Sequence, residues 1–262
     1  MMRYVRLYGA FLAQHFKVLM EHRLNFLIAT LSTLFWQGTG ILAVWIVLDQ
    51  VPDLNGWSKQ EIFLIYGLST MALGLAGIFG VNLLYIGQGY VRTGRFDLLL
   101  IRPVNPLFHL LADRFGQEGI GNFLAGALLV AYGVGSLGLK LGPLEWGYLV
   151  AVALAGGALY LALDLVTAVA AFWMVVATPL TLAVNHFTQI AAYPLDIYKK
   201  PLRVVMTWLI PYSLVSHYPA QLLLGRPAGL MPYALFPAAA LLCFLAYRFW
   251  LYGLGRYTST GS

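Results

Sequence analysis

The chain has 262 residues, of which 60% are apolar and only 10% are Asp, Glu, Lys or Arg. A soluble globular domain carries about 25% charged residues, so this composition excludes an ordinary cytosolic enzyme, a disordered chain and a nucleic-acid-binding domain. The formal net charge of +6 comes from basic residues that mostly lie at the edges of apolar runs, as expected beside membrane spans. We therefore expect an integral membrane protein with no nucleic-acid partner.

Residues 1–23 are predicted to form an amphipathic helix at the membrane interface. Its polar residues share one face: Arg3, Arg6, Gln14, Lys17 and Glu21. Its apolar residues share the other: Phe11, Leu12, Phe16, Leu19 and Met20. A basic amphipathic helix before a span lies at headgroup level and can attract anionic lipid, so membrane lipid is an expected partner.

Five apolar runs are long enough to cross a bilayer as helices, which takes about 20 residues each. They are residues 24–48, 62–86, 119–139, 146–176 and 231–251. Apolar residues run continuously within them instead of alternating, which excludes a β-barrel. The predicted fold is an all-α integral membrane protein with a single transmembrane domain over 1–262.

Residues 178–226 are interrupted by prolines and admit two interpretations. In the first, 178–197 is a sixth span and 201–226 is a re-entrant segment that dips back from the outer face. In the second, 202–224 is the span and 178–201 lies at the inner face. The prolines expected to break the helices at an outer gate are Pro194, Pro201, Pro211 and Pro219. Both interpretations give six spans and place the two termini on the same side.

Basic residues indicate which side is cytoplasmic. Ten fall on one side if both termini share it: Arg3, Arg6, Lys17, Arg23, Arg92, Arg95, Arg102, Arg114, Arg248 and Arg256. The positive-inside rule then predicts that both termini and the 88–115 loop are cytoplasmic. Taken alone, the rule favours the second interpretation, which also moves Lys199, Lys200 and Arg203 inside.

The loop at 89–112 is the most specific feature of the sequence. It is too short and too charged to span, and its centre reads Gly94-Arg95-Phe96-Asp97-Leu98-Leu99-Leu100-Ile101-Arg102-Pro103-Val104. We predict a short helix that rests on the membrane through its apolar residues, Phe96, Leu98, Leu99 and Leu100. Arg95, Asp97 and Arg102 then face the cytoplasm, and Pro103 ends the helix. Such a segment suits docking to a soluble partner.

Few residues in the spans carry chemistry. Asp164 is the one acidic residue deep in a span, where an unpaired charge is costly, so it is either a substrate or proton site or a group bonded to a neighbouring helix. Asn185 and His186 form a second polar cluster, and with Asp164 they are the candidate substrate path, although a lone histidine in such a run is more often a packing group. The sequence has a single cysteine, Cys243, and contains neither G-x-x-x-x-G-K-[ST] nor H-E-x-x-H. No metal, catalytic or cofactor site is therefore expected in this chain.

Three features together resemble permeases of the ABC-2 type transporter family. They are the amphipathic start, the motif at 94–104 and a proline-punctuated segment that runs from Tyr193-Pro194 to Gly225-Arg226. The last segment is similar to that of the two-permease subgroup, which includes viologen-exporter-like and daunorubicin-type systems. The resemblance covers nearly the whole chain.

This resemblance implies a six-helix half-transporter in the plasma (cytoplasmic or inner) membrane. It implies that Arg95, Phe96, Asp97, Arg102 and Pro103 couple the chain to a separately encoded ATPase dimer, which binds the ATP and Mg²⁺. It also implies that 201–226 is re-entrant on the outer face, against the charge count, and we follow it there. A second permease completes the path, either a second copy or, as the subgroup favours, a related chain.

The expected function is export of a hydrophobic or amphipathic substrate by a subunit that is not itself an enzyme. Two alternatives remain open. One is an intramembrane lipid- or glycan-modifying enzyme that uses Asp164 and His186, and the other is a non-catalytic membrane scaffold.

Overall fold

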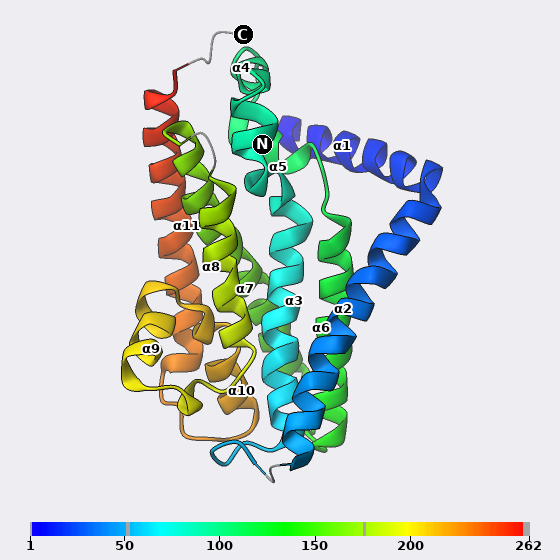
Figure 1. The fold of residues 1–262 in the computed structure, drawn as a ribbon, viewed down its shortest axis with the longest axis vertical. Coiled ribbons are helices and arrows are strands. Elements are labelled where there is room, and N and C mark those ends of the chain that lie inside the picture. The colour runs from blue at the N-terminus through cyan, green and yellow to red at the C-terminus, as the bar shows by residue number, and fades with distance from the viewer. Residues whose placement is uncertain (1, 51–52, 175–176, 259–262) are drawn as a thin grey trace.

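The computed structural model describes residues 2–50, 53–174 and 177–258, and all regular secondary structure within them is helical (Figure 1). The α-helices are α1 (Met2–Glu21), α2 (Arg23–Gln50), α3 (Lys59–Leu84), α4 (Arg95–Leu100), α5 (Pro106–Ala112), α6 (Gln117–Ser136), α7 (Pro143–Val169), α8 (Thr178–Ala191), α9 (Lys200–Val204), α10 (His217–Leu223) and α11 (Met231–Arg256). Two π-helical turns, Ile86–Val91 and Val205–Leu209, follow α3 and α9. Short 3-10 turns lie at Ala170–Phe172, Leu195–Ile197 and Tyr212–Leu214. Residue 1 of the predicted interfacial helix, residues 175–176 of the predicted fourth span and residues 259–262 of the domain lie outside the described residues.

Five helical stretches of the described chain are long and apolar enough to cross a membrane. They are Arg23–Gln50, Lys59–Val91, Gln117–Ser136, Pro143–Phe172 and Met231–Arg256. These correspond to the five predicted runs, so the all-α, multi-pass membrane fold is confirmed. The sixth span stays a prediction, because α8 has 14 residues and at 1.5 Å per residue reaches about 21 Å, short of a hydrocarbon core of about 30 Å.

Three predicted spans extend too far. The run at 146–176 leaves the helical stretch after Phe172, where the N–H groups of Trp173 and Met174 both donate to the Ala170 carbonyl. The run at 119–139 leaves the helix after Ser136, because Gly138 adopts a positive φ of 65° and the Leu139 N–H turns back to the Val134 carbonyl. The run at 178–197 ends at Ala191, where the chain turns before Pro194. A glycine in the left-handed region and a proline each stop a helix that the apolar pattern alone would continue.

The start of α1, the C-terminal end of α11, α4 and α5 lie at one end of the bundle, with α1 across it (Figure 1). We call this the termini end. The short helices α9 and α10 lie toward the opposite, far end (Figure 1). Residues 202–224 therefore do not form the single spanning helix of the second interpretation. The description of 201–226 as a re-entrant segment stays a prediction.

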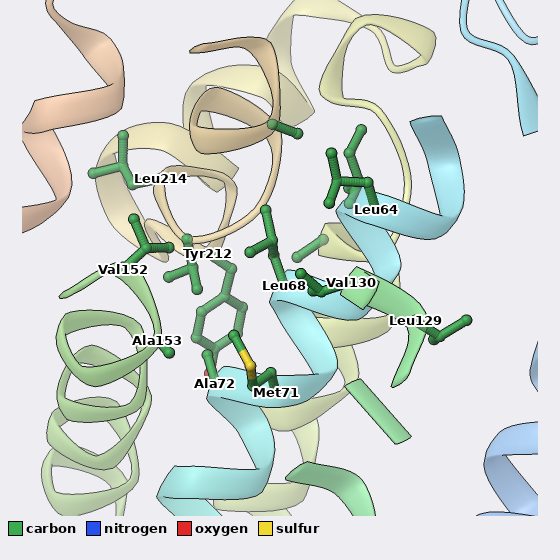
Figure 2. Close-up of a cluster of buried hydrophobic side chains, with 14 of the residues drawn as sticks. Leu64, Leu68, Met71, Ala72, Leu129, Val130, Val152, Ala153, Tyr212 and Leu214 are labelled. Atoms are coloured by element: carbon green, nitrogen blue, oxygen red, sulfur yellow. The ribbon is translucent and has the colours of Figure 1, made fainter. Parts of the chain in front are cut away.

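The core forms around α3, which packs against α6 and α7, while α11 covers α7 and α2 lies outside α6. Figure 2 shows the ring of Tyr212, from the segment between α9 and α10, between Ala153 of α7 and Leu68 and Met71 of α3. The ring of Tyr212 meets that of Tyr160 edge-on at 4.2 Å between centroids. Tyr212 therefore anchors the segment between α9 and α10 in the core of the bundle.

Glycines bring the backbones of α3 and α6 into direct contact. A Cβ added at Gly74 would lie 2.3 Å from the Phe123 nitrogen, and one added at Gly126 would lie 2.3 Å from the Met71 nitrogen. Gly67 and Gly119 meet the opposite helix in the same way, so each helix contributes two glycines seven residues apart. Small residues allow this approach between membrane helices, where packing and not the hydrophobic effect drives association.

We predict that Gly126→Ala lowers the thermal stability of the purified protein. The added methyl group overpacks a backbone contact, which costs about 1–3 kcal/mol. Gly135→Ala on the same helix is the matched control, because nothing lies within 4 Å of its Cβ and alanine is the better helix former by roughly 0.5–1 kcal/mol. Melting followed by intrinsic fluorescence checks this, and equal melting temperatures for the two variants would contradict the close approach.

Candidate functional site

Two adjoining hollows run along one side of α3. The first has a volume of about 930 Å³ and extends from Arg95 and Arg114 at the termini end to Asp164 and Asn185 in the bundle. The second has a volume of about 600 Å³, and among its lining residues are Thr33, Tyr66, Ser69, Thr188 and Gln189. Leu73, Glu118 and Asn122 line both hollows. Together they form one groove between α2, α3, α6 and α8, which we call the cleft.

A chain of hydrogen bonds crosses the cleft between three helices. The Tyr66 hydroxyl on α3 donates to Gln37 Oε1 on α2 at 3.0 Å, and Gln37 Nε2 donates to Asn122 Oδ1 on α6 at 2.8 Å. Glu118 lies one helical turn before Asn122. Sequence reasoning missed these residues, although an amide within an apolar run is itself a signal, because it needs a partner at membrane depth.

Asp164 and Asn185 are brought together, and His186 is not. Asp164 and Asn185 both line the first hollow and their side chains interact, while Asp164 Oδ1 is buried and has no hydrogen-bond partner among the described residues. Thr167 Oγ1 donates to the Asp164 backbone carbonyl at 3.0 Å. His186 is exposed on α8 and is not among the described residues that line the cleft. Of the three residues predicted for the path, two therefore share a site.

The groups that line the cleft do not suit contact with lipid tails. A charged or amide group exposed to hydrocarbon costs several kcal/mol, and the exposed residues Glu118 and Gln189 both line this groove. Exposed residues on other faces of the bundle are large and apolar, such as Leu128 of α6 and Leu154 of α7. The cleft therefore has the character of a surface that faces water or another polar protein surface.

The segment at 94–104 begins at Gly94, whose positive φ of 69° turns the chain into α4. Arg95, Arg102 and Pro103 are exposed at the termini end, and α4 has ended at Leu100 before Pro103 is reached. The Arg95 guanidinium lies 5.7 Å from the centroid of the Tyr90 ring, and the Tyr90 hydroxyl donates to Asp113 Oδ2 at 3.0 Å. Asp97 is half-buried beside Tyr257.

Phe96 and Leu99 are placed differently from the sequence prediction. Both are buried, and Phe96 is completely inaccessible to solvent. Its ring packs edge-on against Phe172, Trp250 and Tyr257, with centroid distances of 5.1, 6.0 and 4.9 Å. The interpretation that Phe96 and Leu99 rest on the membrane is wrong, because α4 buries this face against α11 and the end of α7. Leu98, Leu100 and Ile101 are the exposed apolar residues here.

A network of charged and aromatic groups holds the far end together. Arg226 donates to both carboxylate oxygens of Glu61 at 2.7 and 2.8 Å, and its guanidinium lies 3.9 Å from the centroid of Trp57. Trp57 Nε1 donates to Asp196 Oδ2 at 3.4 Å, and His217 Nε2 lies 3.7 Å from the same oxygen. Burial lowers the pKa of His217 to about 4, so the neutral ring can accept the Leu195 N–H at Nδ1. The start of α3 is thereby tied to α10 and to the segment after α8.

The four predicted gate prolines lie in residues 192–223, between the end of α8 and the end of α10. Pro194 and Pro211 directly precede 3-10 turns, and Pro201 lies in the first turn of α9. Pro219 lies in α10. Pro201 is exposed, whereas the other three are buried. Each lies where proline is tolerated, at the start of a short helix or turn, which explains why this stretch is broken into short pieces.

A multi-pass helical bundle with a polar cleft along its length and a charged segment at one end has the features of the membrane component of a transporter. Residues 34–261 match the family model described as ABC-2 family transporter protein. The chain therefore belongs to the ABC-2 family, a family of membrane transport components. No curated protein and no solved structure matches the chain significantly.

We predict that the cleft is reached by water. Leu73→Cys, made in a Cys243→Ser background that removes the only native cysteine, should react with a membrane-impermeant maleimide, because Leu73 lines both hollows. Leu128→Cys on the apolar outer face of α6, where Leu128 is 66% exposed, should react at least about ten-fold more slowly, since a thiol in hydrocarbon stays protonated and unreactive. Equal labelling rates at the two positions would mean that the cleft is sealed from water.

Proposed function

We propose that this chain is the membrane-spanning permease subunit of an ATP-driven exporter. The observation that carries the proposal is the cleft, because polar side chains along a membrane bundle suit a path that is shielded from lipid. A second permease facing this groove would enclose a path that neither chain forms alone. Family membership supports a role in transport, and the direction of transport is part of the proposal.

The ATPase is proposed to dock at the termini end. Arg95, Leu98, Ile101 and Arg102 are exposed there on the short segment between α3 and α5. Basic residues concentrate toward this end, which supports its placement on the cytoplasmic side of the plasma membrane. The separately encoded ATPase dimer would hold the ATP and Mg²⁺ and supply the energy, while this chain would bind no cofactor.

The second permease is proposed to be a related chain, as in the two-permease subgroup, with a second copy of this chain as the other outcome. A hydrophobic or amphipathic cargo fits a cleft in which Trp36 and Tyr66 lie beside Gln37 and Thr188. An intramembrane enzyme is supported less well, because His186 and Asp164 do not meet as an acid–base pair. A scaffold role leaves the polar lining of the cleft without a use.

We predict that the chain isolated from its native membrane carries an ATPase subunit and that Arg95→Glu or Arg102→Glu weakens this association about ten-fold or more. Reversing a charge at an interface costs roughly 1.4 kcal/mol or more, whereas surface substitutions usually change folding stability by less than about 0.5 kcal/mol. Affinity purification followed by measurement of ATP hydrolysis checks both points.

Arg248→Glu serves as the control for these charge reversals, because Arg248 is exposed on α11 and lies outside the 89–112 segment. Isolation of the chain without any ATPase would contradict the proposed function. Retention of coupled hydrolysis by both reversals would contradict only the docking site.

Asp164→Asn separates two roles for this aspartate. The amide keeps the shape and much of the hydrogen-bonding capacity of the carboxyl group but loses its charge, so a structural Asp164 should leave assembly and export near normal. If the carboxylate binds cargo, the variant should assemble yet lose export of cationic amphiphiles, while export of neutral ones persists. Transport of a lipophilic cation and of a neutral dye into inside-out vesicles compares the two, and unchanged export of both would rule out the binding role.

A further inference from the structure

The ATPase is proposed to dock at residues 94–104, which we call the docking segment. His109 of α5 is a buried histidine next to it. Its side chain is 6% exposed, and Arg102 Nη1 lies 2.8 Å from its Nε2 atom. An arginine guanidinium has only donors, so Nε2 must accept this bond. The ring is therefore neutral in this arrangement, with its proton on Nδ1.

Three elements meet at this ring. Arg102 belongs to the turn between α4 and α5, and His109 belongs to α5. From α1, the ring of Phe11 packs edge-on against His109, with 5.2 Å between centroids and 85° between planes. His109 thus joins the exposed arginine of the docking segment to the amphipathic helix.

Other contacts hold α1 on the same surface. The Tyr4 ring packs edge-on against Phe108 at 4.9 Å, and the Tyr4 hydroxyl accepts the Asn105 N–H at 3.4 Å. Tyr8 lies near both Phe108 and Phe115. The face of α1 that packs on the protein is therefore aromatic, and the exposed apolar residues Phe16 and Met20 lie outside it.

We propose that His109 is a positioning residue for the docking segment: its neutral ring holds the Arg102 guanidinium through Nε2 and connects it to α1. The inference rests on the proposed function, because it gives Arg102 a fixed geometry in which to meet the ATPase. His109 itself is buried and acts through Arg102. A shift of α1 on the membrane surface would reach the docking segment through Phe11 and this ring.

The charged groups that face the ring set its response to pH. Arg102 is on one side, and Asp113 Oδ1 lies 3.8 Å from Nε2 at the end of α5. From α1 the contact is the uncharged Phe11, with the next titratable group, His15, packed on Phe115. On the α3 side, Asn82 Nδ2 donates to the neighbouring Leu110 carbonyl at 2.7 Å.

Acid should break the contact. Burial and then Arg102 lower the pKa of His109 below its usual 6.5, and Asp113 offsets part of this. The stability that depends on a neutral His109 is therefore fully present above about pH 6.5. It is lost as the pH falls through the lowered pKa. Once protonated, Nε2–H and the guanidinium are two donors that face each other, so Arg102 must leave.

Hydrogen exchange on the full chain in nanodiscs tests the geometry without any ATPase. At pH 7.5, His109→Phe keeps a ring against Phe11 but removes the acceptor, and exchange across 101–109 should rise about five-fold or more. His109→Gln keeps an uncharged acceptor and should stay closer to the wild type. In the wild type, exchange corrected for its intrinsic pH dependence should stay constant from pH 7.5 to about 6.5 and rise as the pH falls further, and His109→Gln should show no such rise.

Exposed His186 supplies the matched control, since His186→Gln removes a histidine ring from α8, outside the docking segment. The proposal would be overturned if His109→Phe exchanged across 101–109 at the same rate as the wild type. It would also be overturned if the acid-induced rise persisted in His109→Gln. This result does not depend on whether the chain is an exporter subunit.

The complex with its ATPase gives the second readout. Hydrolysis by the wild-type complex should fall on the acid side by more than hydrolysis by the ATPase alone, and His109→Gln should remove that difference. His109→Phe should reduce hydrolysis most at neutral pH, where the wild-type ring still holds Arg102. A pH profile that is the same in wild type and His109→Gln overturns the positioning role, whereas failure to recover any ATPase counts against the proposed function and leaves the exchange result to decide the role of His109.

Discussion

The close approach of α3 to its neighbours is the constraint on which the rest of the structure depends. In lipid, helices gain little by hiding apolar side chains from one another, so contact must come from packing at short range. Four glycines allow α3 and α6 to meet backbone to backbone, and Gly156 and Gly157 of α7 lie against Ala72 and Leu75 of α3. With α3 held between α6 and α7, its remaining side is left free, and the cleft lies along that side.

The two ends of α3 are held by different kinds of interaction. At the far end, Glu61 caps the helix together with Ser58 and also binds Arg226, so one carboxylate joins the start of α3 to the loop before α11. At the termini end, the helix continues through a π-helical turn to Val91 and leads within a few residues to Gly94 and α4. Such turns are frequent at functional sites. The cleft wall is thus continuous with the segment proposed to receive the ATPase.

The sequence predicted the parts of the fold that depend on local composition. Five spans follow from apolar runs, and the helix breaks near Pro194 and Pro211 follow from backbone chemistry. The limits at 139 and 197 were wrong, because a left-handed glycine at Gly138 and the turn at Ala192 are not visible in an apolar count.

The burial of Phe96 could not be predicted, since its partners Phe172, Trp250 and Tyr257 are distant in the chain. The same holds for the cleft, where Gln37 and Asn122 are separated by 85 residues, and for His109, whose role depends on Arg102 and on Phe11 of α1.

The peripheral position of α2 has a consequence for how the protein is made. Its packing within the bundle is chiefly with α6, so the first span enters the bilayer well before its partner is synthesised. Chain growth from Gln50 to Ser136 adds 86 residues, which takes roughly 4 to 17 s at about 5 to 20 residues per second. During that interval α2 must persist as a single helix in lipid, and its large exposed residues, such as Leu31, Phe35 and Ile46, suit it to that state. The contact between α2 and α6 is therefore completed only after α2 has entered the bilayer, and the cleft cannot assemble before then.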